Sequence, residues 1–177
     1  YGGQSISLAH LAPFVNISRE KIRKDVMEEL ELLGCTPSDE KIAEIVETRL
    51  KKEITKGVQT IQYQINTLMT TNGQSPFVTL FLNLKEDDPY KDEVALIIEE
   101  ILKQRIQGIK NEAGVYITPA FPKLIYVLDE HNCLKGGKYD YLTKLAVECS
   151  SKRMYPDYIS AKKMRENYEG EVFSCMG

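Results

Sequence analysis

The sequence predicts an α/β fold in which a parallel sheet is joined to a long helical hairpin. Two runs, residues 77–84 and 124–128, are nearly continuous in apolar and β-branched residues, as is typical of strands buried on both faces. A helical pattern follows each run, and this alternation favours parallel pairing through right-handed crossovers. Residues 18–71 are expected to form the hairpin and residues 72–177 the strand–helix units, all within one domain spanning residues 1–177.

The composition is that of an ordinary globular protein, with 177 residues of which 42% are hydrophobic and 28% charged. A net charge of -3 gives no basic footprint, which argues against nucleic acid or a membrane surface as the main partner. No apolar run approaches the length of a bilayer span and no signal peptide is recognisable, so we expect a cytoplasmic location.

The first helix of the hairpin is predicted over residues 18–33, where Ile22, Val26 and Leu30 recur at four-residue steps. Ser18 is its expected N-cap and Gly34 its expected end.

The second helix is predicted to start at Thr36 as N-cap, with Pro37 at the first helical position, and to run to the Asn72-Gly73 turn. About 30 helical residues would reach roughly 45 Å at 1.5 Å per residue. Because a compact domain of this size does not need that length, part of the helix is expected to pack on another chain or a missing part.

Polar residues that could carry chemistry follow the later elements. Residues 129–133 come directly after the second strand, where parallel α/β sheets place ligand sites, although a structural role is favoured for such a loop. Residues 149–157 end a helix that begins near Asp140, and their hydroxyls beside Lys152 and Arg153 could receive phosphate oxygens. Cations at a helix C-terminus are also ordinary dipole partners, and both interpretations stay open.

Two further features have ordinary explanations that the sequence favours. The Gly2-Gly3-Gln4-Ser5 segment could approach an anion through its amides, but a turn is favoured. The four cysteines are scattered without a C-x-x-C pair, which favours reduced thiols over disulfides or a zinc site. They are Cys35, Cys133, Cys149 and Cys175.

Both ends of the chain are expected to be cuts inside a longer protein. The first residue is Tyr1 rather than an initiator Met, and the last residues, Cys175-Met176-Gly177, form no polar tail.

Four strings, in this order, resemble the large subunit of class III (anaerobic) ribonucleotide reductases. They are YGGQS (residues 1–5), QINTLMTTNGQSPF (64–77), LIYVLDEHN (124–132) and CSSKRMYPD (149–157), the last followed by Cys175-Met176-Gly177. Together the strings span the whole chain.

The resemblance implies a ten-stranded α/β barrel built from two antiparallel halves of five parallel strands. This chain would supply part of one half together with the hairpin. It also implies an oxidoreductase that reduces ribonucleoside triphosphates to deoxyribonucleotides for DNA precursor synthesis. In this family a glycyl radical is made by a separate radical S-adenosylmethionine iron–sulfur activase. The radical passes to a cysteine, whose thiyl abstracts the ribose 3′-hydrogen.

The family's catalytic loop reads Met-Gly-Cys-Arg, so the thiyl cysteine is expected just after Gly177 and no catalytic residue or metal ligand lies within the chain. The resemblance implies that the glycyl radical, a structural zinc and most of the substrate pocket belong to the rest of the parent. The chain by itself is therefore expected to be inactive and to bind no cofactor. Four residues resemble the active-site floor, where they would suit substrate phosphate or loop anchoring: Ser150, Ser151, Arg153 and Met154.

The hairpin resembles the family's homodimer face, where ATP and deoxynucleotide effectors exert allosteric control. The implied effector-binding residues are Lys52, Lys56, Gln59 and Tyr63. Composition alone favours a solvated helix face for this stretch, because Glu44, Glu47 and Glu53 intermingle with its cations.

Two alternatives of a different kind remain. The chain could be a non-enzymatic dimerisation or regulatory module whose helices bind a partner helix, or part of another glycyl-radical enzyme such as a lyase.

Overall fold

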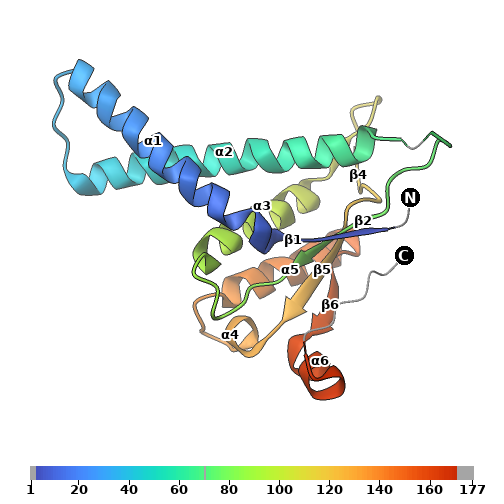
Figure 1. Cartoon of the computed structure of the whole chain (residues 1–177). Coiled ribbons are helices and arrows are strands. Elements are labelled where there is room, and N and C mark those ends of the chain that lie inside the picture. The colour runs from blue at the N-terminus through green and yellow to red at the C-terminus, as the bar shows by residue number, and fades with distance from the viewer. Residues whose placement is uncertain (1–2, 70, 171–177) are drawn as a thin grey trace.

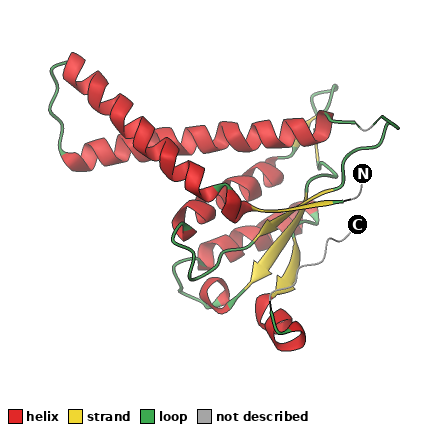
Figure 2. Cartoon of the chain, viewed as in Figure 1, coloured by secondary structure: helices red, strands yellow, loops and turns green. Residues whose placement is uncertain are grey.

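A helical arm projects from an α/β body in the computed structural model, which describes residues 3–69 and 71–170 (Figure 1). The arm consists of two helices and the loop that joins them, and the strands of the described residues lie in the body (Figure 2). The elements in chain order are β1 (Gln4–Ser7), the 3-10 helix η1 (Leu8–His10), α1 (Ala12–Leu32), α2 (Asp39–Thr67), β2 (Val78–Leu82), α3 (Lys91–Gln107), β3 (Ile109–Lys110), β4 (Tyr116–Ile117), β5 (Lys123–Leu128), α4 (Glu130–Cys133), α5 (Asp140–Arg153), β6 (Asp157–Ser160) and α6 (Ala161–Tyr168). None of these helices is long and apolar enough to cross a membrane.

The main sheet contains four strands in the order β1-β2-β5-β6, and every neighbouring pair is parallel. This confirms the predicted α/β class with a parallel sheet. The central strand β2 is buried at every position, as its continuous apolar sequence indicates. The edge strands β1 and β6 were not predicted, because their mixed polar sequences carry no buried-strand pattern.

The residues that follow the glycine pair, which is expected to form a turn, belong to a strand. Gln4 and Ser5 lie in β1, where they pair with Val78 and Thr79 of β2. Pairing with a neighbouring strand, rather than the local sequence, makes these residues a strand. Tyr1 and Gly2 lie outside the described residues.

Helix α1 begins six residues before its predicted start, at Ala12 rather than Ser18. Pro13 occupies the first turn, where its missing N–H costs nothing, and η1 leads directly into it. Ser18 is therefore inside the helix, and its hydroxyl donates to Glu53 of α2 at 2.9 Å instead of capping. The predicted end is confirmed, with Gly34 in the left-handed region at φ 65°.

Helix α2 begins after Ser38, and the prediction of Thr36 as N-cap is wrong. The Ser38 side chain accepts from the backbone N–H of Lys41, so the cap lies after Pro37 rather than before it. The helix ends at Thr67, four residues short of the predicted boundary, and still has 29 residues.

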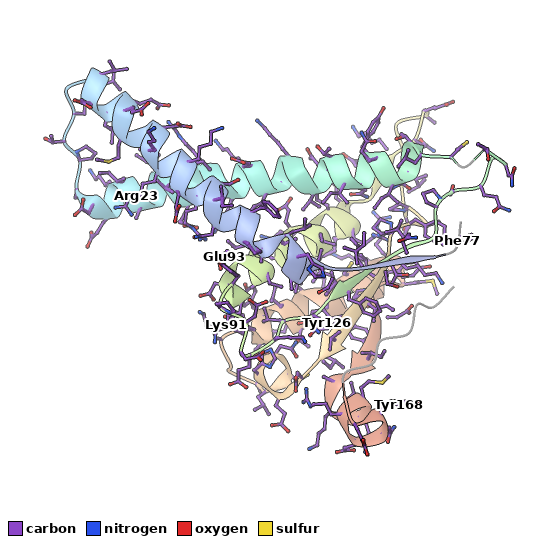
Figure 3. All side chains as sticks on the ribbon, in the orientation of Figure 1. Arg23, Phe77, Lys91, Glu93, Tyr126 and Tyr168 are labelled. Atoms are coloured by element: carbon purple, nitrogen blue, oxygen red, sulfur yellow. The ribbon has the colours of Figure 1, made fainter. Side chains whose placement is uncertain are left out.

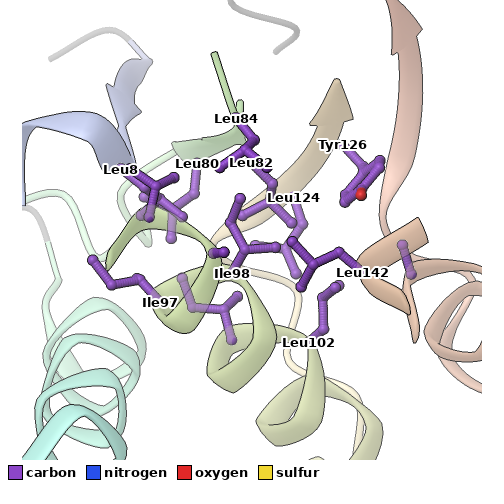
Figure 4. Close-up of a cluster of buried hydrophobic side chains, with 14 of the residues drawn as sticks. Leu8, Leu80, Leu82, Leu84, Ile97, Ile98, Leu102, Leu124, Tyr126 and Leu142 are labelled. Carbon is purple, nitrogen blue, oxygen red and sulfur yellow. The ribbon is translucent and has the colours of Figure 1, made fainter. Parts of the chain in front are cut away.

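The main core fills the space between one face of the sheet, helices α3 and α5, and the body end of α2 (Figure 4). In Figure 4, Ile97, Ile98 and Leu102 of α3 face Leu82 and Leu124 of the strands. A second, smaller cluster joins α1 to α2 within the arm and consists of Ile22, Val26, Ile42, Val46 and Leu50. On the other face of the sheet lies a third cluster of Phe81, Ile125, Val127 and Ala161.

Candidate functional site

The two serines predicted at the active-site floor occupy the last turn of α5 and use their hydroxyls within the fold. Ser150 Oγ donates to the Pro156 carbonyl at 3.0 Å and lies 2.8 Å from the Tyr158 hydroxyl. Ser151 Oγ donates to the Glu148 carbonyl at 2.8 Å. Both hydroxyls thus bind backbone acceptors around the end of the helix.

The Arg153 guanidinium ties α5 to the end of α3. Its Nε donates to the Ile106 carbonyl at 2.9 Å and its Nη2 to the Gln107 carbonyl at 2.8 Å. Its Nη1 reaches Thr118 Oγ1 at 3.3 Å. Because three of its nitrogens are engaged, Arg153 fastens three segments together at this point.

A second arginine in the same region, Arg105, was missed by the sequence analysis. It is only 3% exposed, and it donates to the carbonyls of Pro119 at 3.2 Å and Pro122 at 2.5 Å. Its guanidinium also lies over the Tyr155 ring, 5.6 Å from the centroid. Burial lowers the pKa of Arg105 to about 10. In the sequence, Arg105 could have been found as a cation at a position of α3 where an apolar residue is expected.

Gly108 lets these segments meet. Its φ is 81°, and a Cβ at this position would lie 2.6 Å from the Ile117 carbonyl oxygen and 3.1 Å from Arg153 Nη2. Only glycine satisfies both the left-handed backbone and the close approach.

Arg153 and Tyr155 line an open hollow of about 540 Å³, and Arg105 lies behind its lining residues Pro119 and Tyr155. Lys123 and Asp157, the first residues of β5 and β6, lie on its edge, so the hollow is at the amino ends of the strands. Met154 is 86% exposed at its rim and has a left-handed φ of 62°. The residues lining the hollow are Thr118, Pro119, Ala120, Lys123, Lys152, Arg153, Met154, Tyr155 and Asp157.

The polar cluster at the opposite, carboxyl edge has a structural role, as the sequence favoured. Asp129 caps α4 and accepts two hydrogen bonds from Arg165 of α6, at 2.9 and 2.8 Å. The side-chain hydrogen bond from Arg165 keeps the pKa of Asp129 below its usual value. His131 contacts the Leu84 carbonyl through Nε2, and Asn132 donates to the Val127 carbonyl at 2.9 Å. These contacts tie α4 and α6 to the ends of the strands.

The four effector candidates all lie exposed on α2 but do not share one hollow. Gln59 and Tyr63 line a hollow of about 280 Å³ between α2 and the end of α3. Lys52 lines a separate groove nearer the arm tip, and Lys56 lines neither. Three further glutamines that the sequence analysis missed complete the α2–α3 hollow: Gln62, Gln104 and Gln107. In the sequence, these glutamines could have been found as amide side chains that recur near the ends of two predicted helices.

Cys133 is exposed, and burial of its thiol raises the pKa above its usual value. The thiol lies 3.2 Å from the Asn132 side-chain oxygen. In residues 3–69 and 71–170, no group of three or more His, Cys, Asp or Glu side chains is arranged to hold a metal ion. Cys175 and the Met176-Gly177 pair of the expected radical loop lie outside the described residues.

The chain has an α/β body with a parallel sheet and a helical arm. This class of fold serves many different enzymes. A family model described as "Anaerobic ribonucleoside-triphosphate reductase" matches residues 1–177, and the chain belongs to this family. This confirms the resemblance found in the sequence.

Curated relatives carry the same name. The chain is 40% identical to the anaerobic ribonucleoside-triphosphate reductase of Escherichia coli and 38% identical to that of Haemophilus influenzae, each over 164 residues. Those alignments cover 90% of this chain and 21% of each relative. The Enterobacteria phage T4 protein is 39% identical over 117 residues, covering 66% of this chain and 18% of the relative. The chain thus spans about one fifth of the length of these relatives.

Proposed function

We propose that this chain is part of the catalytic subunit of an anaerobic ribonucleoside-triphosphate reductase. The whole subunit would reduce ribonucleoside triphosphates to deoxyribonucleoside triphosphates by glycyl and thiyl radical chemistry in the cytoplasm. The observation that carries the proposal is the family match over residues 1–177, with 38–40% identity to named reductases. The chain itself would be inactive without the rest of the subunit.

The four parallel strands support the partial-barrel part of the proposal. They would belong to one five-stranded half of a ten-stranded barrel, and within the described residues both edge strands, β1 and β6, have a free edge that could continue the sheet. In a barrel whose halves run antiparallel, the amino edge of one half shares a rim with the carboxyl edge of the other. Residues at the amino edge would then reach the rim that carries ligands in the second half.

The hydrogen bonds that Ser150, Ser151 and Arg153 make to backbone carbonyls favour loop anchoring over phosphate binding for these residues. Each of these side chains already bonds to the body of the fold. Met154 would be the residue that they present toward the active site. The arm would form the homodimer face and bind effectors, with Gln59 and Tyr63 as the pair that shares a hollow. The activase would be a separate partner, and the structural zinc would belong to the rest of the subunit.

Anaerobic turnover of the full-length protein tests the proposal. The assay contains the activase, a reductant and each ribonucleoside triphosphate. A variant changes the cysteine expected after Gly177 to Ala, and Cys35→Ala is the matched control, because Cys35 is an exposed thiol at the arm tip. We expect deoxynucleotide from the wild type and the control and none from the first variant.

The other outcomes separate the alternatives. A glycyl radical signal without deoxynucleotide would favour another glycyl-radical enzyme. If no radical forms under validated activation conditions, the dimerisation module becomes the better explanation.

A further inference from the structure

The cations around the hollow at the amino ends of the strands differ in whether they already have partners. Arg153 is bound to carbonyls and to Thr118, and Arg105 is bound to the carbonyls of Pro119 and Pro122. Lys152 Nζ lies 2.6 Å from Glu148 Oε1. Each of these three cations therefore already has an acceptor or a carboxylate beside it, although Lys152 and Arg153 keep N–H donors that these contacts do not use.

Lys123 differs from these cations. It is half-buried at the first position of β5 and lines the hollow, and within the described part of the chain its ammonium makes no ion pair. Its position is fixed by the pairing of β5 with β2, where Lys123 stands opposite Thr79. The backbone of Lys123 is therefore fixed in the sheet, and among the described residues no carboxylate pairs with its ammonium.

Thr118 supplies a second available donor. Its Oγ1 accepts from Arg153 Nη1 at 3.3 Å, which leaves its hydroxyl hydrogen to point elsewhere. Because a guanidinium donates to this oxygen, the hydroxyl is polarised toward donation. Thr118 and Lys123 both line the hollow, so a single group could contact both.

The electrostatic balance of the hollow favours an anion. Among the described residues, its lining includes Lys123, Lys152 and Arg153 but only one carboxylate, Asp157. Behind the wall, the Arg105 charge is met by carbonyls and a ring rather than by a carboxylate in the described residues. The hollow of about 540 Å³ lies within the usual size range of small-molecule sites.

We propose that Lys123, with the Thr118 hydroxyl, binds phosphate groups of the ribonucleoside triphosphate in this hollow, and that Arg105 and Arg153 are positioning residues that hold its walls. The inference rests on the proposed function and assigns the phosphate contacts to residues other than the four expected from the sequence. An ammonium donating to phosphate is a charge-assisted bond, stronger than a neutral one.

The test compares Lys123→Gln with Lys152→Gln in the full-length, activated enzyme. Both variants remove one positive charge from the same hollow, but Lys152 is held by Glu148. We expect Lys123→Gln to raise KM for the ribonucleoside triphosphates about 10-fold with kcat within about two-fold. Lys152→Gln should change KM by less than about two-fold, and Lys123→Arg should restore most of the loss. Inorganic tripolyphosphate serves as a competing probe, and its inhibition should weaken in parallel with KM in Lys123→Gln.

Several results would overturn the inference. They are an unchanged KM in Lys123→Gln, an equal rise in both Gln variants, or a fall in kcat alone. Lys123-dependent binding of inorganic phosphate with an unchanged nucleotide KM would indicate a site for free phosphate instead. Absence of deoxynucleotide from the wild type would refute the proposed function. In that case, comparing tripolyphosphate binding by the wild type and by Lys123→Gln still tests the anion site directly. Circular dichroism of each variant separates these outcomes from misfolding.

Discussion

The arm and the body both contain long helices, but they are stabilised differently. The body buries its strands against α3 and α5, so its core is continuous and draws on distant parts of the chain (Figure 4). The arm has a narrow seam of five buried residues and adds ion pairs between its helices and to α3. Figure 3 shows Glu93 of α3 where the arm crosses the body. A long helical pair can thus project from a domain while its root remains anchored.

The largest expected effect comes from matched core deletions. Leu102 in the body and Leu50 in the arm are both 0% exposed, so Leu→Ala removes the same atoms at each site. We expect a loss of unfolding free energy of about 4 kcal/mol for Leu102→Ala and about 2 kcal/mol for Leu50→Ala, because the thin seam can collapse around a cavity. Urea unfolding gives the energies, and hydrogen exchange should show α1 and α2 opening locally in Leu50→Ala. Equal losses would mean that the arm is packed as rigidly as the body.

A smaller effect is expected at the junction of arm and body. Arg19 of α1 donates to Glu47 of α2 at 2.7 Å and also binds Glu93 of α3. Arg19→Gln should cost about 1 kcal/mol, since Glu93 is left without its cation in a partly buried position. The measurement is faster hydrogen exchange in α1, with Arg23→Gln as the control because Arg23 is exposed on the same helix. No difference between the two variants would show that apolar contacts alone anchor the arm.

The smallest effect is a pH dependence at the other end of the body. The Arg165 guanidinium lowers the pKa of Asp129 in the folded state. The contribution of Asp129 to stability is therefore present above its unfolded pKa of about 3.9 and is lost as the pH falls through the lower folded value. Asp129→Asn, which can still cap α4, should lower Tm at pH 6, and its difference from the wild type should shrink toward pH 3.

Glu130→Gln is the control for the Asp129 variant. Glu130 is exposed, and its nearest cation, Lys162, lies 3.6 Å away. A difference between Asp129→Asn and the wild type that stays constant from pH 3 to pH 6 would contradict the role of the Arg165 pair.

The periodicity of the sequence was sufficient to predict the long elements. The apolar runs of β2 and β5, the hairpin and the start of α5 at Asp140 were predicted because burial imposes a repeat on consecutive residues. The helix starts at residues 12 and 39 were missed, because several residues in each stretch could cap or open a helix and packing selects among them. The short edge strands β1 and β6 were missed for the same reason, since pairing with β2 and β5 rather than their own sequence makes them strands.

The candidate site divides in the same way. The sequence by itself determined the family and the α/β class, because these depend on strings of consecutive residues, while the role of residues 149–157 stays a prediction. Only the tertiary structure decided that Ser150, Ser151 and Arg153 donate to backbone carbonyls, while Lys123 has no ion-pair partner among the described residues. The physical reason is that hydrogen-bond partners of a side chain come from segments far apart in the chain. Here the ends of α3 and α5 and the start of β5 meet at one edge of the sheet.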